Sequence, residues 1–398
     1  MIAYSGRCCL VRPVPATRLK IETVTEEIQK IVAELPGLTD VTGVNAIVDE
    51  RVARGEAAFA ADLGIALSAA RKAAGPSAWQ YEAVLDHLLR LLATTPGPGN
   101  AAQALRLVAS AFDSSGKGAR YPASLLATGH TAEDLAPAFT GSASDELRSC
   151  LLQELVLRGA PVAQNPAIAT WAAAPERLGH PLSWLPLTLS GIESEAALPS
   201  HGVGSSGWAT PYGPSSHRSA AAARGTVTTG VVDTTSPAQA AAMAAAVATW
   251  TDESNGRVEA RVFDLTEPLD AEAIPGALLT LGLECLAGVE KSSGLSGIMR
   301  TPAEAWRVLF AAASTGGAYG YGAFGAYGRL ATWRSMAALV GSPEDATPAE
   351  VEARALDCVW YGFDADTEWF EQVAWDFGLA ALSPNRRRLT VLAATDTD

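Results

Sequence analysis

The stretch RVEARVFDL, residues 257–265, has the composition of a β-strand, in a chain whose other long segments mostly show helical patterns. Its valines alternate in part with charged residues, and β-branched and aromatic side chains favour extended backbone. By the same criterion we expect strands at TVTTGVVD (226–233), SWLPLTLSG (183–191) and RLTVLAATDTD (388–398). The sequence therefore predicts a small β component, all of it after residue 180.

Helices lie between these strands, and three of them share one start signal. Ser236, Thr301 and Thr347 are each followed by proline, with glutamine or glutamate three residues after the hydroxyl. In this capping-box pattern the hydroxyl is the N-cap, proline takes the first helical position, and the glutamine or glutamate bonds back to the N-cap backbone. Residues 226–398 are therefore expected to form an α+β domain with few strands and many helices.

Residues 21–180 are expected to form an all-helical domain, after a loose tail at residues 1–20. Apolar residues recur at three- and four-residue spacing, for example in SAWQYEAVLDHLLRLLATT (77–95), and brief Pro/Gly turns separate the segments. An α-solenoid and an irregular bundle both fit this pattern, because no strict repeat period is present. The predicted fold class is mainly α with a small β component, and residues 181–225 supply one strand and a Gly/Ser/Pro-rich loop.

Composition limits the compartment and the partners. The 398 residues are 48% hydrophobic and 18% charged, which is typical of a globular chain with more than one core. The net charge of −14 gives no general attraction for nucleic acid or an anionic membrane, so neither is expected as a partner. The five cysteines show no zinc-site or disulfide-framework spacing, and no signal peptide or membrane-length apolar run is evident. We expect reduced thiols and a cytoplasmic location.

The tract GGAYGYGAFGAYG, Gly316–Gly328, is the most unusual part of the sequence. Gly320, Gly322 and Gly325 match the spacing of a dinucleotide-binding fingerprint, but that motif needs a strand before it, and a helix from Thr301 precedes it here. Aromatic residues and glycines recur every three residues. This period favours a close-packing helical seam with buried rings, whereas a ligand-binding wall containing Tyr319 and Tyr321 is the alternative.

The segment LPSHGVGSSGWATPYGPSSHRSA, residues 198–220, is a second candidate site. Connections this long without clear secondary structure are usually functional loops or linkers. No Gly-x-Ser-x-Gly elbow is present, and no acid is placed to orient a histidine, so a structural or disordered loop is favoured. The residues with chemical potential in this loop are His201, Trp208, Tyr212, His217 and Arg218.

Asp364, Asp366 and Glu368 alternate along the chain and form a weak candidate for a metal site. Carboxylates of this kind hold Mg²⁺ or Ca²⁺, which prefer oxygen ligands. No glycine and no distant glutamate complete a calcium loop here. Helix capping by Asp366 or Thr367, with Glu368 in the first turn, explains the residues without a metal. No metal and no cofactor are therefore expected.

Three blocks of the sequence resemble a known family. They are GGAYGYGAFGAYGRLATWRS (316–335), RVEARVFDL (257–265) and WFEQVAWDFGLAALSPNRRRLTVLAATDTD (369–398). Together they look like an uncharacterised actinobacterial family, a domain of unknown function. The resemblance covers most of the chain beyond residue 20 and is firmer in the C-terminal half. Because such a family has no established chemistry, the resemblance implies no role for any residue.

Two functions remain open from the sequence. The first is a cytosolic interaction protein without catalytic activity, because no nucleophile motif, metal cluster or phosphate loop is present. The second is a small-molecule hydrolase or transferase with a pocket between the 198–218 loop and the glycine–aromatic tract. In that pocket Arg329 and Arg334 would bind an anionic group, and His201 or His217 would act as acid or base. The partner is accordingly a protein or a small molecule.

Overall fold

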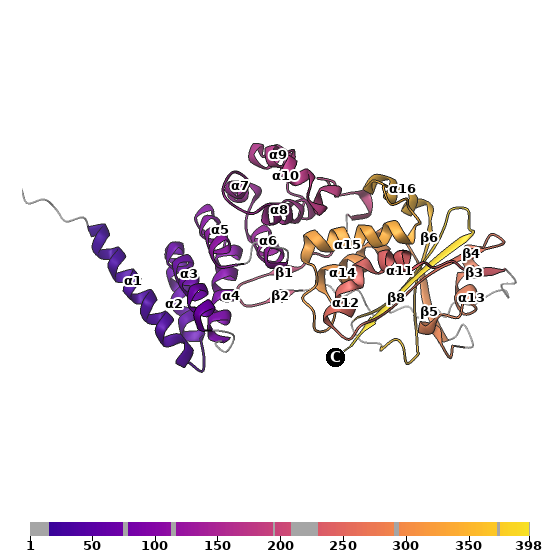
Figure 1. Ribbon diagram of the computed structural model, residues 1–398, viewed down its shortest axis with the longest axis horizontal. Coiled ribbons are helices and arrows are strands. Elements are labelled where there is room, and N and C mark those ends of the chain that lie inside the picture. Colours follow the sequence, from indigo (N-terminus) through magenta and orange to yellow (C-terminus); the bar gives the residue numbers. More distant parts are fainter. Residues whose placement is uncertain are drawn as a thin grey trace, which may run out of the picture. The chain divides into compact units, whose positions relative to one another are not determined.

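The computed structural model describes residues 16–74, 79–112, 117–193, 196–207, 230–289, 294–371 and 375–397. The chain forms two compact units, Met1–Leu92 and Ala93–Asp398. A mostly helical array is followed by a region with a six-stranded antiparallel sheet and further helices (Figure 1). The predicted fold class is therefore confirmed, whereas the predicted domain boundary near residue 180 stays a prediction.

The first unit contains helices α1 (Ala16–Glu34), α2 (Thr42–Ala53), α3 (Ala57–Ala74) and most of α4 (Trp79–Thr94). α1 begins at Ala16, inside the segment expected to be a loose tail, and residues 1–15 lie outside the described residues. Along α4, residues three and four apart are buried, among them Leu85, Leu88 and Leu92, as the apolar spacing predicts.

The helical part of the second unit is built around one buried helix. Its helices are α5 (Pro98–Ala111), α6 (Lys117–Gly129), α7 (Ala132–Thr140), α8 (Asp145–Leu157), α9 (Pro166–Ala172) and α10 (Pro175–Leu178). Ser144 caps α8, and all of Ser149–Leu157 is buried, including Gln153 and Glu154. No strand occurs in the described residues between 21 and 160, in agreement with the helical prediction.

The sheet has the strand order β3-β4-β8-β7-β6-β5, and every neighbouring pair is antiparallel. Its strands are β3 (Val231–Asp233), β4 (Arg257–Leu265), β5 (Leu295–Arg300), β6 (Val359–Ala365), β7 (Trp375–Leu382) and β8 (Arg388–Asp396). β4 and β8 confirm the predicted strands. β8 is central and buried along almost its whole length, because helices cover both faces of the sheet.

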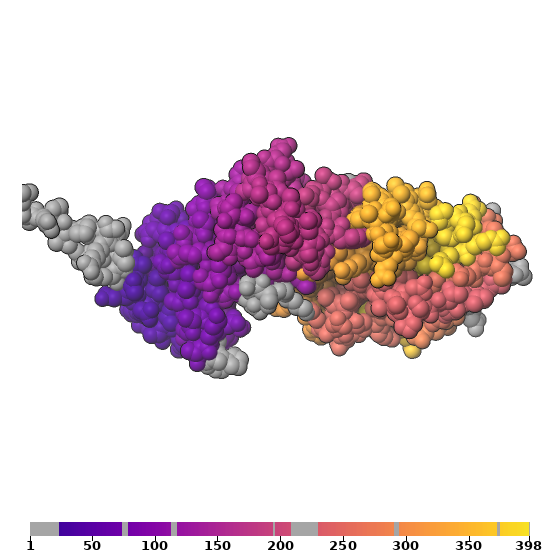
Figure 2. Space-filling model, turned by 45° about the horizontal axis from the view of Figure 1, so that its top comes forward, coloured from indigo at the N-terminus to yellow at the C-terminus, as the bar shows by residue number. Residues whose placement is uncertain are grey.

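Different helices cover the two faces of the sheet. α11 (Pro237–Met243), α12 (Ala248–Glu253), α14 (Pro302–Thr315) and α15 (Phe324–Leu339) lie on one face, and α13 (Ile274–Leu278) lies on the other (Figure 1). α16 (Pro348–Asp357) packs on α15. The helices α14–α16, in orange, form one continuous surface with the segment that precedes residue 193 (Figure 2). All three predicted capping boxes are present, at Ser236, Thr301 and Thr347.

Two segments differ from the predicted elements. Ser183–Gly191 is not a strand: it continues a 3-10 turn, Pro181–Trp184, as irregular chain, because Pro186 has no N–H and side chains bind the local carbonyls. In TVTTGVVD only Val231–Asp233 is a strand, and residues 226–229 lie outside the described residues. A small hairpin, β1 (Ser200–His201) with β2 (Ser206–Gly207), follows the irregular segment. None of the helices described combines the length and the hydropathy that a membrane span requires.

Candidate functional site

The glycine–aromatic tract is half loop and half helix. α14 ends at Thr315 and α15 begins at Phe324, so residues 316–323 form a loop, which we name the tyrosine loop. Gly316 and Gly322 have φ values of 85° and 61°, a left-handed region that favours glycine, and a Cβ on either would collide with the backbone of the other. The expected helical seam is therefore wrong for residues 316–323, because a tight turn needs these glycines.

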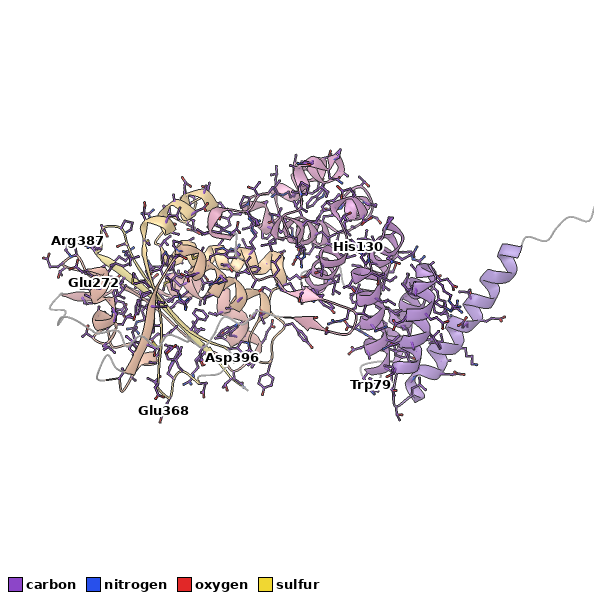
Figure 3. All side chains as sticks on the ribbon, turned by 180° about the vertical axis from the view of Figure 1, so that it is seen from behind. Trp79, His130, Glu272, Glu368, Arg387 and Asp396 are labelled. Carbon is purple, nitrogen blue, oxygen red and sulfur yellow. The ribbon has the colours of Figure 1, made fainter. Side chains whose placement is uncertain are left out.

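Asp396, at the end of β8, holds the tyrosine loop in place (Figure 3). Its Oδ2 accepts the Ala318 N–H at 2.6 Å, and its Oδ1 accepts the Ser254 hydroxyl at 3.0 Å. A side chain at Gly317 would collide with the same carboxylate. At the other end of the loop, the Ala323 N–H donates to the Ala313 carbonyl at 2.8 Å. The loop is thus fixed at both ends by hydrogen bonds.

The rings of the tract divide between solvent and core. Tyr319 and Tyr321 are 60% and 79% exposed, so the prediction of buried rings is wrong for both, because the loop turns them outward. Phe324 is buried and Tyr327 is partly buried, because both lie on α15. The carboxylate of Glu253, at the end of α12, lies beside Gly320. The loop therefore presents two aromatic rings, with an acid from α12 beside its backbone.

The packing prediction holds for the glycines within α15. A Cβ at Gly325 would lie 2.6 Å from the Glu154 carboxylate. That carboxylate accepts the Ala326 N–H at 3.1 Å in the first turn of α15, and it also pairs with Arg158. A negative charge at a helix N-terminus is stabilising. A Cβ at Gly328 would lie 3.0 Å from the backbone of Ser314 on α14. Both glycines thus allow close approach.

Arg329 is fully buried, and its guanidinium donates to four other residues of a polar network. Its Nε and Nη2 donate to the two oxygens of Glu193 at 2.6 and 2.8 Å. The remaining guanidinium hydrogens bond to oxygens of Gln153 (2.5 Å), Pro186 (2.9 Å) and Thr188 (3.0 Å). All five donors of the guanidinium are used. The interpretation of Arg329 as an anion-binding residue is therefore wrong, because no donor is left for a ligand.

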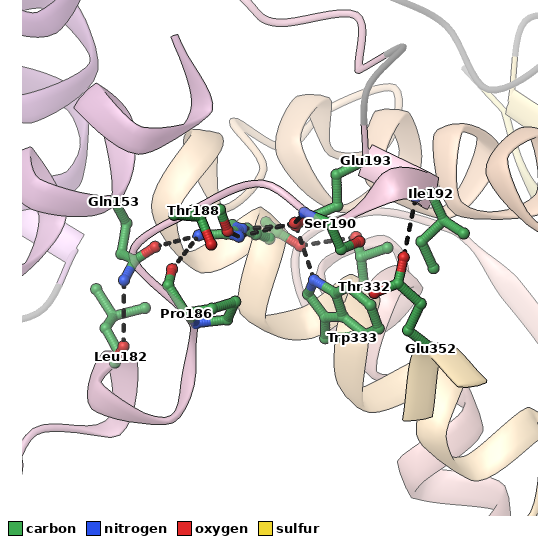
Figure 4. Close-up of polar contacts among 12 residues, drawn as sticks. Gln153, Leu182, Pro186, Thr188, Ser190, Ile192, Glu193, Thr332, Trp333 and Glu352 are labelled. Carbon is green, nitrogen blue, oxygen red and sulfur yellow. Dashed lines mark hydrogen bonds and ion pairs between the residues drawn. The ribbon is translucent and has the colours of Figure 1, made fainter. Parts of the chain in front are cut away.

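Glu193 is fully buried as well, and the chain itself satisfies its charge. Besides Arg329, its oxygens accept the Trp333 indole N–H at 2.8 Å and the Ser190 backbone N–H at 2.8 Å (Figure 4). The network ties the irregular 182–193 segment to α15 and α8. Arg334, by contrast, is exposed on the same helix. The two arginines that the sequence grouped together therefore lie in opposite environments.

His201 lies between two serines. Its Nε2 is 3.2 Å from the hydroxyl of Ser124 on α6, and its Nδ1 is 3.0 Å from the Ser206 hydroxyl. The Tyr121 ring contacts His201 edge-on at 6.1 Å and Phe324 at 5.5 Å, measured between ring centroids. The β1–β2 hairpin thus reaches the start of α15 through Tyr121. The other loop candidates, Trp208, Tyr212, His217 and Arg218, lie outside the described residues.

A second polar cluster surrounds Tyr327. The Arg120 guanidinium lies 3.7 Å from the centroid of the Tyr327 ring. His180 Nε2 is 2.8 Å from Glu146 Oε2, and the Cys150 thiol donates to the other Glu146 oxygen at 3.7 Å. Burial and, secondarily, Glu146 raise the pKa of both the Tyr327 phenol and the Cys150 thiol. Both groups therefore remain protonated near neutral pH. The sequence did not reveal this cluster, because its members come from four separate segments.

The acidic triplet does not converge. Asp364 is half-buried in β6, whereas Asp366 and Glu368 are exposed on the turn that follows, where Figure 3 labels Glu368 at the periphery. The Thr367 hydroxyl accepts the N–H groups of Trp369 and Phe370, but no helix begins there. The expected helix N-cap is therefore wrong. Over the described ranges, no group of three or more His, Cys, Asp or Glu side chains is placed to hold a metal ion.

A groove of about 570 Å³ lies between α1 and α3 in the first unit. Ile28 and Phe59 are buried beneath it, and the Arg51 guanidinium lies 4.2 Å from the Phe59 ring centroid while pairing with Glu27 and Glu56. This lining suits an apolar side chain. The lining residues are Val24, Thr25, Ile28, Gln29, Arg51, Glu56, Ala58, Phe59, Asp62 and Ala66. The sequence gives no signal for it, because any two amphipathic helices show the same apolar spacing.

Comparison with known proteins places the chain in a family. No curated protein and no solved structure matches it. One family model, described as a family of unknown function (DUF6183), matches residues 42–398, which is most of the chain. The match begins at the first residue of α2 and includes the whole second unit, with the tyrosine loop and the buried Arg329 network. The chain therefore belongs to the family of unknown function DUF6183.

Proposed function

We propose that this protein is an interaction protein, without catalytic activity of its own, which binds a partner protein through the tyrosine loop. The observation that carries the proposal is the exposure of Tyr319 and Tyr321 on a loop held by Asp396. Tyrosine is enriched among the residues that dominate binding energy, because a large amphipathic ring gains much contact area with few rotatable bonds. A loop fixed before binding loses little conformational entropy when it binds.

The charge around the loop favours a basic partner surface. Glu253 lies beside Gly320, and the whole chain carries a net charge of −14. Complementary charge accelerates association and disfavours acidic partners. The exposed aromatic rings also suit an arginine, which stacks on a tyrosine face.

Replacing Tyr319 and Tyr321 together with serine is expected to weaken partner binding at least about 30-fold, which corresponds to a loss of about 2 kcal/mol. Stability should change by no more than about 0.5 kcal/mol, because both rings are exposed. The partner can be identified by photo-crosslinking from position 321, and its affinity for the wild type and the double variant can then be measured by titration. Trp79→Ser, at an exposed ring in the first unit, is the control. Equal affinity of wild type and double variant would refute the proposal.

A second candidate function is a hydrolase or transferase acting on a small molecule. The contact of His201 with both Ser124 and Ser206 favours it, because a histidine next to a serine hydroxyl accepts its proton when the oxygen attacks an acyl carbonyl. Ser206 would hold the ring through Nδ1. Ser124 is fully buried, so a substrate would reach it only after the β1–β2 hairpin moves aside.

Hydrolysis of p-nitrophenyl acetate tests this second candidate. If Ser124 is the nucleophile, Ser124→Ala should lower the rate about 100-fold or more, and Ser206→Ala should lower it less. Ser183→Ala is the control, because the Ser183 hydroxyl donates instead to the Leu178 carbonyl. A wild type with no activity above that of the Ser124→Ala variant would eliminate the candidate.

Two narrower statements extend the family membership. We propose that the block GGAYGYGAFGAYGRLATWRS is characteristic of an actinobacterial branch of the family, since its glycines are needed by the turn and by the α15 packing. We also propose a cytoplasmic location. It is supported by Cys150, Cys285 and Cys358, which are free and buried; burial raises the pKa of the Cys358 thiol to about 11. An alignment of family members and fractionation of the source cells test these two statements.

A further inference from the structure

β5 forms one edge of the sheet, and among the described strands none pairs with its outer side. Its six residues pair with β6 in unbroken register on the inner side. Within the part of the chain that the structure describes, no backbone group of residues 295–300 hydrogen bonds to a backbone group beyond β6. Ile298 and Met299 are 43% and 48% exposed, although consecutive residues of a strand point to opposite faces. Both faces of the strand are therefore accessible at this edge.

The β5 edge lacks the features that normally prevent strand pairing. Soluble proteins protect an edge with prolines, lysines, bulges or very short strands. The opposite edge, β3, follows this rule: it has three residues and carries Asp233, which is paired with Arg261. β5 is twice as long, contains no proline or lysine, and has one charged residue, Arg300, at its end. Such an edge is a template for an added strand.

We propose that β5 pairs with β5 of a second copy of this chain, antiparallel, about a twofold axis perpendicular to the sheet. In this arrangement opposed residues lie on the same face of the continuous sheet. An even-numbered residue is therefore opposite an even-numbered one, and an odd-numbered residue opposite an odd-numbered one. A register centred on Met299 would set Ile298 opposite the charged Arg300, whereas the register centred on Ile298 sets Ile298 opposite Ile298. It also sets Met299 opposite Gly297, and Arg300 opposite Ser296.

The side chains are complementary in this register. A Cβ at Gly297 would collide with the phenol of the buried Tyr361, so the space above this glycine is already filled from β6. Met299 of the second copy lies opposite Gly297, beside the Tyr361 ring, and a thioether packs well against an aromatic ring. The two Ile298 side chains form a β-branched cross-strand pair. Each long side chain thus faces a small residue or its own equivalent.

The charges also favour the antiparallel direction over the parallel one. The two Arg300 side chains lie at opposite ends of the paired strands, each across from a serine, so no like charges face each other. A parallel pairing would bring them together. Each Arg300 also lies 3.7 Å from Glu304 of its own chain, which lowers its repulsion of the second copy. The strand is self-complementary in the antiparallel direction alone.

Cysteine cross-linking tests the register. The background chain carries Cys8→Ser and Cys9→Ser, and its other cysteines, Cys150, Cys285 and Cys358, are buried. Ile298→Cys is expected to form an intermolecular disulfide on mild oxidation, because opposed Cα atoms of antiparallel strands lie about 4.5–5.5 Å apart. Met299→Cys should stay reduced, since it faces a glycine. Absence of the Ile298→Cys disulfide, or equal cross-linking of both variants, overturns the proposal.

Sedimentation velocity over a concentration series tests association itself. The wild type is expected to dimerise reversibly, and Ile298→Lys should raise the dimer dissociation constant at least about tenfold. Its far-ultraviolet circular dichroism should match the wild type, because residue 298 is exposed. Val232→Lys, at the exposed surface of β3, is the control and should still dimerise. The proposal is overturned if the wild type stays monomeric even at salt concentrations that screen its net charge of −14. It is also overturned if Val232→Lys raises the dimer dissociation constant as much as Ile298→Lys does.

Discussion

Replacing Arg329 with methionine is expected to lower the free energy of unfolding by about 3–5 kcal/mol. Methionine keeps an apolar stem in the space but removes the guanidinium from a site where both it and Glu193 are fully buried. Glu193 would keep only two N–H donors, from Trp333 and Ser190, and no counter-charge. A buried carboxylate without a counter-charge is strongly destabilising, since the interior replaces little of its lost hydration.

Urea unfolding followed by tryptophan fluorescence measures this loss. Arg334→Met is the matched control, because Arg334 lies on the same helix but is exposed, and its variant should differ from the wild type by no more than about 0.5 kcal/mol. The double variant Arg329→Met, Glu193→Met should recover part of the loss, because it removes both charges together. If Arg329→Met lowers the free energy of unfolding by less than about 1 kcal/mol, the network does not hold the 182–193 segment to α15 and α8.

Replacing Gly325 with leucine is expected to cost about 3 kcal/mol or more. The Cβ alone would lie 2.6 Å from the Glu154 carboxylate, at the place where α15 packs on α8. Inserting methylene groups into a packed site typically costs about 1–3 kcal/mol. Here the substitution also displaces a buried carboxylate from the Ala326 N–H and from Arg158, so the cost should reach or exceed the upper end of that range.

Thermal melting with and without NAD or ATP separates packing from nucleotide binding. Gly99→Leu is the matched control: this glycine is exposed in the first turn of α5, and a Cβ there would meet nothing within 4 Å. We expect Gly325→Leu to melt well below both the control and the wild type, whatever nucleotide is added. A variant that melts like the wild type, together with a wild type that nucleotide stabilises, would contradict the packing account and restore the fingerprint interpretation.

Some elements were predictable because their causes are local. A capping box needs only a hydroxyl and an acid or amide three residues later, so Ser236, Thr301 and Thr347 were recognised correctly. β4 and β8 were recognised by their β-branched content. β7, WDFGLAAL, was missed because leucine and alanine favour a helix locally, and a strand buried on both faces shows no alternation.

The candidate sites were less predictable, because their contacts span long stretches of chain. Arg329 and Glu193 are 136 residues apart, and neither shows locally that it will be buried. The same holds for Ser124 and His201, which are 77 residues apart. The prediction for the glycine–aromatic tract is wrong for a related reason. Its three-residue period suggests one continuous helix, whereas Gly316 and Gly322 adopt left-handed backbone and end the helical conformation there.

Local sequence was thus sufficient for the fold class, the capped helices and two of the central strands, because nearest-neighbour sterics and short-range hydrogen bonds specify them. Long-range packing settled the rest: which arginine is buried and which is exposed, which tyrosines face solvent, and which sheet edge is open. These outcomes depend on desolvation, and desolvation is a property of the assembled core. Arg329 and Arg334 lie five residues apart on one helix, yet only their surroundings distinguish a structural tie from a solvated charge.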